Sequence, residues 1–321
     1  MIEGISRLLP IMLAAAMLMV PASLAGAQEQ DGLDGLKLPG ITGYASPRHE
    51  ERLATGRGEI TLSAQLIEQG TDIPRGMVWR IFRPGADETG KLPLVASAQG
   101  GTATFDLEPG SYLVHAAYGR AGATKRITVG REPHRETLVL DAGGLELDAV
   151  LSGGQRIPRE KLRFSIYEGH PSGDNDNGTL IIPNVQPNTV VRLNAGTYHV
   201  VSTYGGVNAV IRSDIRVEAG KLTEAMVEHH AAEVTLKLVR ETGGEAIADT
   251  SWSVLNESGD PIKETVGAFA PMVLAEGDYT VVAKNRDRIY QKDFSVEAGK
   301  NEEVEVIASE DTAIDPEEGA D

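Results

Sequence analysis

The chain has 321 residues, a formal net charge of −17 and no cysteine. Without cysteine it has no disulfides, no lipoprotein anchor, no thiol catalysis and no cysteine-ligated metal. The negative charge excludes nucleic acid as a partner, because phosphate contacts need clustered lysine and arginine side chains.

Residues 1–27 have the pattern of a secretory signal peptide. Arg7 gives a basic start, an apolar run extends over residues 8–20, and Ala25-Gly26-Ala27 supplies small residues for cleavage before Gln28. The apolar run is shorter than the roughly 20 residues of a membrane-spanning helix. We therefore expect a cleaved leader, export to the periplasm or out of the cell, and no membrane span in the mature chain.

Two further segments lack any period of apolar residues. Residues 28–57 mix glycine, proline and charge, so we expect an extended, mobile linker. Residues 310–321 contain six acidic and no basic residues, which predicts a disordered acidic tail.

A Leu-x-x-Gly-x-Tyr-x-Val motif occurs three times. Its glycines are spaced by roughly 80 to 90 residues, too far for a solenoid repeat and suitable for a small β-sandwich domain. The glycine allows a tight backbone corner before the strand. The tyrosine ring is expected to fill the core while its hydroxyl returns to the backbone, as in the tyrosine corner of immunoglobulin-type sandwiches. The corner residues are Gly110 with Tyr112, Gly196 with Tyr198, and Gly277 with Tyr279.

The same elements flank each motif in the same order. An alternating strand opens each unit, and a strand with a central aromatic residue precedes the motif. We expect the aromatic residues Trp79, Phe164 and Trp252 in the core, on the sheet opposite the tyrosine. The predicted opening strands are Ile60–Ala64, Leu145–Ala149 and Val234–Leu238, and the aromatic strands are Val78–Ile81, Arg163–Ile166 and Ser251–Val254.

These patterns predict an all-β fold of three tandem antiparallel β-sandwich modules, with no convincing helical period after the leader. We place the modules at residues 58–142, 143–230 and 231–309. The joints at residues 141–144 and 228–232 are short, so we expect a semi-rigid rod.

The third module resembles prealbumin-like, immunoglobulin-like bacterial surface modules, such as collagen-adhesin B-type and carboxypeptidase regulatory-like domains. The resemblance rests on its alternating strand, the turn Thr242-Gly-Gly-Glu-Ala-Ile247, the aromatic strand and the corner motif. It covers all three modules, most clearly residues 233–297, and implies a fold rather than an activity. The whole chain is also similar to exported proteins of alphaproteobacteria.

Adhesin modules of that kind often carry a lysine–asparagine isopeptide bond that a buried acid promotes. The resemblance would place the lysine at Lys237 and the acid four residues after each corner tyrosine. Ala116, Ser202 and Ala283 occupy those positions. Without the acid we expect no isopeptide crosslink.

Candidates for metal binding are few. Asp174 and Asp176 have the spacing of calcium ligands, but the loop glycine is out of register and such residues are ordinary in β-turns. We expect a turn, with calcium as the alternative. The adjacent His229 and His230 point to opposite faces of a strand, so a solvated joint is expected rather than a metal site.

Catalytic patterns are missing from the sequence. It has no nucleophile elbow, zinc-binding histidine pair, phosphate loop or dinucleotide fingerprint. His115 and His199 follow their corner tyrosines at different distances, so we expect them on half-exposed faces and not in a repeated site. We predict that the chain is not an enzyme and takes no cofactor.

We expect a non-catalytic interaction or scaffold protein of the cell envelope, bound to an envelope protein or polysaccharide. One alternative is a carbohydrate-binding protein, which needs exposed rings to stack on sugars; Tyr118, Tyr204 and Tyr290 are the candidates. Another alternative is an accessory subunit of an envelope enzyme.

Overall fold

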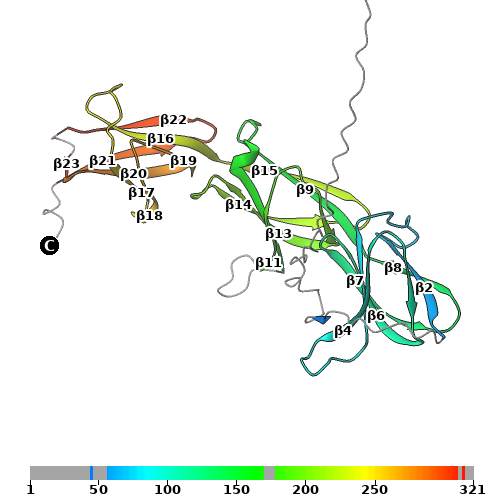
Figure 1. Cartoon of the computed structure of the whole chain (residues 1–321). Helices are drawn as coiled ribbons and strands as arrows, with labels where there is room; N and C mark the ends of the chain where they lie inside the picture. The colour runs from blue at the N-terminus through cyan, green and yellow to red at the C-terminus, as the bar shows by residue number, and fades with distance from the viewer. Residues whose placement is uncertain (1–43, 46–55, 170–177, 310–312, 315–321) are drawn as a thin grey trace, which may run out of the picture.

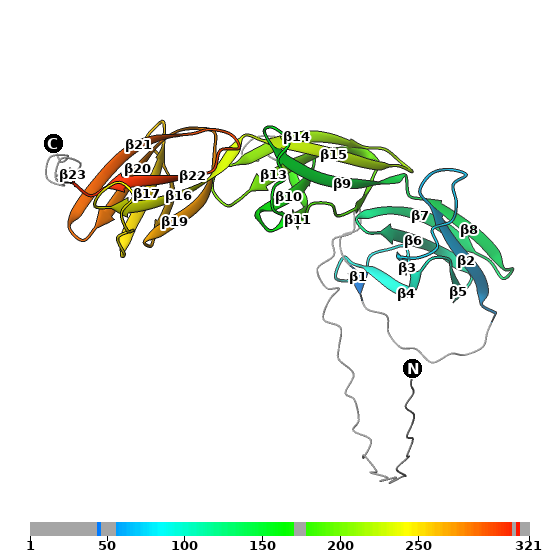
Figure 2. The ribbon, with the colours of Figure 1, turned by 90° about the horizontal axis from the view of Figure 1, so that it is seen from above.

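The computed structural model of the chain describes residues 44–45, 56–169, 178–309 and 313–314. Its strands form three similar units, which follow one another in a line (Figure 1; Figure 2). The predicted fold class of tandem antiparallel β-sandwiches is confirmed. Within the described ranges, no helix is both long enough and apolar enough to cross a membrane.

We call the three units the first, second and third modules and define them by their strands. The first module contains β2 (Gly58–Gln65), β3 (Met77–Phe82), β4 (Leu92–Gly100), β5 (Ala103–Leu107), β6 (Gly110–Tyr118), β7 (Ala121–Val129) and β8 (His134–Val139). The second contains β9 (Ala142–Leu151), the 3₁₀ turn η1 (Arg159–Lys161), β10 (Leu162–Glu168), β11 (Thr179–Val185), β12 (Val191–Asn194), β13 (Gly196–Tyr204), β14 (Val210–Val217) and β15 (Leu222–His229). The third contains β16 (Ala231–Val239), β17 (Thr250–Asn256), β18 (Pro261–Val266), β19 (Phe269–Ala275), β20 (Gly277–Asn285), β21 (Arg288–Val296) and β22 (Glu302–Ile307).

All three modules share one topology. The opening strand (β2, β9 or β16) lies at the centre of a three-stranded sheet, with an antiparallel neighbour on one side and the parallel closing strand on the other. A second sheet packs against it, and its four strands follow the order β4-β3-β6-β7 in the first module. The aromatic strand and the corner strand are therefore neighbours in one sheet.

That pairing corrects one expectation. Trp79 lies opposite Ala116 of β6 in the same sheet as Tyr112, and not in the facing sheet. The alternating pattern gives the buried face of a strand but not its neighbour. Trp79 and Trp252 are buried as expected, and their indole nitrogens donate to the carbonyls of Gly101 and Gly267, each at 2.8 Å.

Each module has its own core. The clusters of buried side chains draw on residues 60–142, on residues 145–231 with Val273, and on residues 232–306. Ala142 and Ala231 open the strands of a following module but are buried in the core of the preceding one. Neighbouring modules therefore share core residues and have no linker between them.

The corner tyrosines have one geometry in all three modules. Each hydroxyl donates to the backbone carbonyl four residues earlier: Tyr112 to Glu108 at 2.8 Å, Tyr198 to Asn194 at 2.9 Å, and Tyr279 to Ala275 at 2.8 Å. The rings are at most 6% exposed. The bond ties the start of the corner strand to the end of the strand before it, across the glycine turn.

Short strands also form outside the modules. Tyr44–Ala45 (β1), within the predicted linker, pairs in parallel with β4. Ala313–Ile314 (β23), within the predicted disordered tail, pairs with β21. These two pairings correct the expectation of wholly irregular segments, because the edge strands β4 and β21 offer unpaired backbone groups to any extended segment nearby. The predicted signal peptide, residues 1–27, lies outside the described residues.

Replacing Tyr112 by phenylalanine tests the corner. The variant keeps the ring in the core but leaves the Glu108 carbonyl without its donor, so we expect the first module to lose about 1 kcal/mol of unfolding free energy. Urea unfolding followed by Trp79 fluorescence measures the change. Tyr167→Phe, at a half-exposed position, is the control. A Tyr112→Phe chain as stable as the parent would show that the hydroxyl bond contributes nothing.

Candidate functional site

The most specific polar contacts in the chain lie at the joints between modules. At both joints, the turn after the corner strand of one module meets the corner of the next. In the first joint, the turn between β6 and β7 meets β12; in the second, the turn between β13 and β14 meets β19. The corner of each following module therefore also forms its contact surface with the module before it.

Asn194 seals the first joint. Its side-chain nitrogen donates to the carbonyls of Leu140 (2.7 Å) and Gly122 (3.1 Å), and its oxygen accepts from the Gly122 amide at 3.1 Å. The Asn194 carbonyl also accepts the corner bond of Tyr198. One residue thus fixes both the corner and the joint.

An arginine covers the edge of the same joint. The guanidinium carbon of Arg192 lies 4.4 Å from the ring centroid of Tyr118. The backbone carbonyl of Arg192 accepts a hydrogen bond from the Arg120 amide at 3.0 Å. Cation–π contacts of this kind contribute about 0.5–1 kcal/mol at exposed sites.

The second joint is closer and partly apolar. Val273 of the third module is 5% exposed and belongs to the core of the second. Gly205 lies against it so tightly that a Cβ at this position would be 2.6 Å from the Val273 Cβ. The joint requires glycine there, for the space and for its φ of +72°.

Asn208, in the turn between β13 and β14 of the second module, closes the second joint with two hydrogen bonds. Its side-chain nitrogen donates to the Tyr279 hydroxyl at 2.8 Å, and its oxygen accepts from the Ala275 amide at 3.0 Å. The second module therefore holds both ends of the corner of the third.

A charged cluster completes this joint. Lys161 pairs with Glu233 at 2.6 Å, and the Tyr204 hydroxyl donates to the same carboxylate at 3.0 Å. The Lys161 bond lowers the pKa of Glu233, whereas burial and the bond to that carboxylate raise the pKa of Tyr204. Glu233 is therefore ionised and the Tyr204 hydroxyl neutral around neutral pH.

Two histidines are buried, contrary to expectation. His229 is 1% exposed, 2.7 Å from the Ser202 hydroxyl, and its ring meets Tyr204 edge-on; only His230 faces solvent. His115 is 2% exposed, with a bond to Thr124 at 2.9 Å. Both residues lie near joints, where the adjoining module or strand covers a face that a single sandwich would leave open. His199 is partly exposed and bonds Asp214.

Burial lowers the pKa of both histidines to about 4, and the neighbouring Arg80 and His230 add to the shift at His115 and His229 respectively. The imidazoles are neutral at pH 7. The Ser202–His229 pair resembles a nucleophile with its base, but both side chains are about 1% exposed. Its role is to satisfy a buried polar atom.

The rings proposed as a sugar platform are covered. Tyr204 is 1% exposed and Tyr290 6% exposed, and Arg192 lies over Tyr118. The sequence suggested exposure because these tyrosines lie outside the repeated core positions, but Tyr204 and Tyr290 belong to the cores of their modules and Tyr118 is covered at the first joint. Asp174 and Asp176 lie outside the described residues, so their calcium alternative stays a prediction. Across the described segments, no three histidine or acidic side chains are grouped to hold a metal ion.

Lys237 has ionic partners. Its ammonium group pairs with Glu303 and, at 3.0 Å, with Glu305, which also accepts from the Gly243 amide. These bonds raise the pKa of Lys237. The side chain at the position where the resemblance would place an isopeptide lysine is therefore held charged, and a charged ammonium is not a nucleophile.

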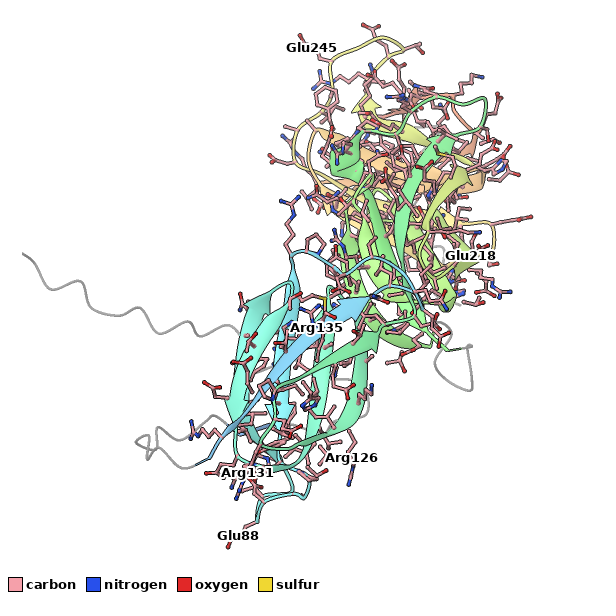
Figure 3. The ribbon with its side chains drawn as sticks, turned by 90° about the vertical axis from the view of Figure 1, so that its right-hand side faces the viewer. Glu88, Arg126, Arg131, Arg135, Glu218 and Glu245 are labelled. Atoms are coloured by element: carbon pink, nitrogen blue, oxygen red, sulfur yellow. The ribbon has the colours of Figure 1, made fainter. Side chains whose placement is uncertain are left out.

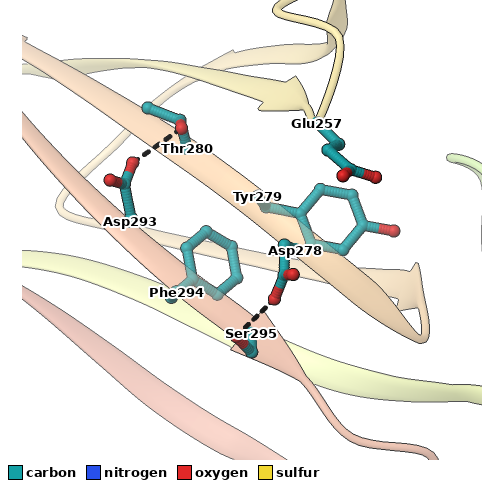
Figure 4. A pocket seen from close by; sticks show the side chains of 7 residues that line it. All are labelled: Glu257, Asp278, Tyr279, Thr280, Asp293, Phe294 and Ser295. Carbon is teal, nitrogen blue, oxygen red and sulfur yellow. Dashed lines mark hydrogen bonds between the residues drawn. The ribbon is translucent and has the colours of Figure 1, made fainter.

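A groove of about 370 Å³ lies on the outer side of the third module (Figure 4). Thr280 donates to Asp293 at 2.7 Å, and Ser295 donates to Asp278. The aromatic floor is the stacked pair of Tyr279 and Phe294, whose centroids are 5.7 Å apart. These hydroxyls and carboxylates bond to one another across β20 and β21, and the carboxylate of Glu257 also lines the groove.

A comparison with sequence models of protein families gives a match in the third module. Residues 233–308 match the sequence model of a Rhizobiales growth-associated tandem repeat domain. No curated protein matches the chain.

Solved structures give loose likenesses. The Bacillus anthracis TIE protein is 19% identical over 79% of this chain, which spans 50% of that protein, with a TM-score of 0.24. The minor pilin GBS52 of Streptococcus agalactiae is 16% identical over 54% of this chain and 95% of its own, with a TM-score of 0.31. The major pilin subunit BcpA of Bacillus cereus is 10% identical over 79% of this chain and 100% of its own, with a TM-score of 0.22. None of them superposes closely on the whole chain.

The second joint can be tested with two adjacent glycines. Gly205→Val introduces a side chain at positive φ against Val273, and we expect a cost of about 1–3 kcal/mol and a loosened joint. Small-angle scattering and protease cleavage near residue 230 measure the loosening. Gly206→Val is the matched control, because a Cβ there meets nothing within 4 Å. Equal behaviour of the two variants would contradict the tight joint.

The buried His115 predicts acid sensitivity in the first module. Its pKa is about 4 when folded and about 6.5 when unfolded, so the unfolded chain binds more protons between these values. Stability is full above pH 6.5 and falls as the pH drops toward 4. At pH 5 we expect a loss of about 2 kcal/mol relative to pH 7.

Trp79 fluorescence reports this transition in a Trp252→Phe chain, since the sequence has two tryptophans. The acid loss should shrink in His115→Gln. The third module, which contains no histidine, is the internal control when Trp252 is kept and Trp79 replaced. An unchanged pH dependence in His115→Gln would contradict the assignment.

Proposed function

We propose that the chain is an exported, non-catalytic scaffold of the cell envelope, which holds an envelope protein partner along a rod of three modules. The observation that carries the proposal is the pair of sealed joints. Asn194 and Asn208 each bridge two modules through several hydrogen bonds, and Val273 joins a neighbouring core. Such joints keep modules at fixed spacing, which a scaffold needs and a single-site enzyme does not.

Surface chemistry supports the same role. Charged side chains point outward over all three modules, among them Glu88, Arg126, Glu218 and Glu245 (Figure 3). A surface of this kind keeps an elongated chain soluble. The most exposed large apolar side chains among the described residues lie on the second and third modules, where Met226 is 63%, Val266 70% and Phe269 56% exposed. Exposed apolar side chains of this size suit contacts with a protein.

The match of the third module to a growth-associated repeat domain supports a partner that acts in cell growth. Carbohydrate binding loses its support, because the candidate rings are buried or covered.

Site-specific photocrosslinking in living cells tests the proposal. A photoreactive residue at Phe269 or Met226 should give one discrete adduct with an envelope protein, because both positions are exposed and apolar. The control position is Glu245, an exposed charged residue on a loop of the third module. Adducts of equal intensity at all three positions, or none at the apolar ones, would contradict the proposal.

A further inference from the structure

The turn that enters each joint has a counterpart at the far end of the third module. Gly119, Gly205 and Arg286 each stand seven residues after a corner tyrosine. All three have positive φ, at 67°, 72° and 53°. Gly119 and Gly205 lie in the two internal joints, whereas Arg286 lies at the exposed end of the third module.

The surface that contacts each turn also has an equivalent on the first module. A Cβ on Gly119 would be 3.0 Å from the Arg192 Cβ, and one on Gly205 would be 2.6 Å from the Val273 Cβ. Arg192 and Val273 each stand six residues before a corner tyrosine. The equivalent residue of the first module is Asp106, which is exposed.

The two unused halves carry opposite charge. Arg286 is a cation where the internal joints have glycine, and Asp106 is an anion where they have arginine or valine. The neighbours reinforce the contrast. The turn carries exposed Lys284 and Arg288 and one exposed acid, Asp287, so it remains cationic, and exposed Glu59 and Glu108 flank the receiving surface. Glu108 pairs with Arg83 at 3.2 Å, but both side chains are 61% exposed, so this ion pair exchanges easily.

We propose that copies of this chain associate head to tail, with the β20–β21 turn of one copy against the first-module corner of the next. Arg286 pairs with Asp106 of the next copy, in the position where the internal joints place their glycine contact. The surface that binds differs from the surface that is bound, so the contact is heterologous and can repeat along a line. Continuity with two established joints and charge complementarity identify the occupant as a second copy.

The end-to-end contact is weaker than the internal joints. The side chain of Arg286 prevents the close backbone approach that Gly205 permits, so the modules meet through exposed ion pairs. Such pairs contribute modestly and are screened by salt. The association is therefore reversible, dependent on concentration and favoured at low ionic strength. It does not depend on the proposed envelope partner.

Sedimentation velocity of the purified chain is the first measurement. At low salt we expect the weight-average sedimentation coefficient to rise with protein concentration, and the rise to vanish at high salt. A chain that stays monomeric at every concentration and salt level would overturn the proposal. So would an association that strengthens with salt, because that indicates apolar contact.

Charge reversal then identifies the surfaces. Arg286→Glu faces Asp106, and Asp106→Arg faces Arg286, so each variant alone should associate at least about tenfold more weakly. Mixing the two variants creates complementary pairs at every contact and should restore the association. Arg126→Glu, with the same charge change in the middle of β7, is the control and should behave as the parent (Figure 3). A mixture that stays dissociated, or a control that weakens equally, would overturn the assignment.

Discussion

The hydroxyl of each corner tyrosine donates to a carbonyl four residues earlier, and both joints are built on the strand ending that this bond holds in place. Asn194 supplies the carbonyl that Tyr198 bonds and uses its side chain to grip the first module. In the second joint Asn208 bonds the Tyr279 hydroxyl itself. A change at the corner would therefore act on a module and on its connection to the module before it.

The two joints share one geometry but are stabilised by different interactions. The first combines the hydrogen bonds of the Asn194 amide with an arginine over a tyrosine ring. The second buries Val273 and adds the ion pair of Lys161 and Glu233, close to the buried His229. His115 lies next to Gly122 of the first joint and His229 lies beside the second, and burial lowers the pKa of both to about 4. Acid would therefore weaken both joints over the same pH range.

Sequence patterns were sufficient for the fold because alternation and the corner motif are local. The corner glycines and tyrosines and the opening strands are all read within ten residues. Trp79 shows the limit: its burial follows from the pattern, whereas its sheet depends on a pairing partner more than thirty residues away. The contacts that seal the joints were missed for the same reason. Asn208 and Glu233 are ordinary surface residues in the sequence, and Tyr204 is buried only because the neighbouring module and His229 cover it.

The repeat also explains why its two ends differ from its interior. Inside the chain, covalent connection brings turn and corner together, so the joints form through close glycine contacts, hydrogen bonds and short-range ionic contacts without charges to steer their approach. Two separate copies have no such tether and must meet by diffusion. Exposed charges of opposite sign are then useful, because they steer the approach and reject the wrong orientation. Arg286 and Asp106 occupy the positions where this difference applies, and a glycine at 286 with valine at 106 would instead leave an apolar joint permanently open to any copy.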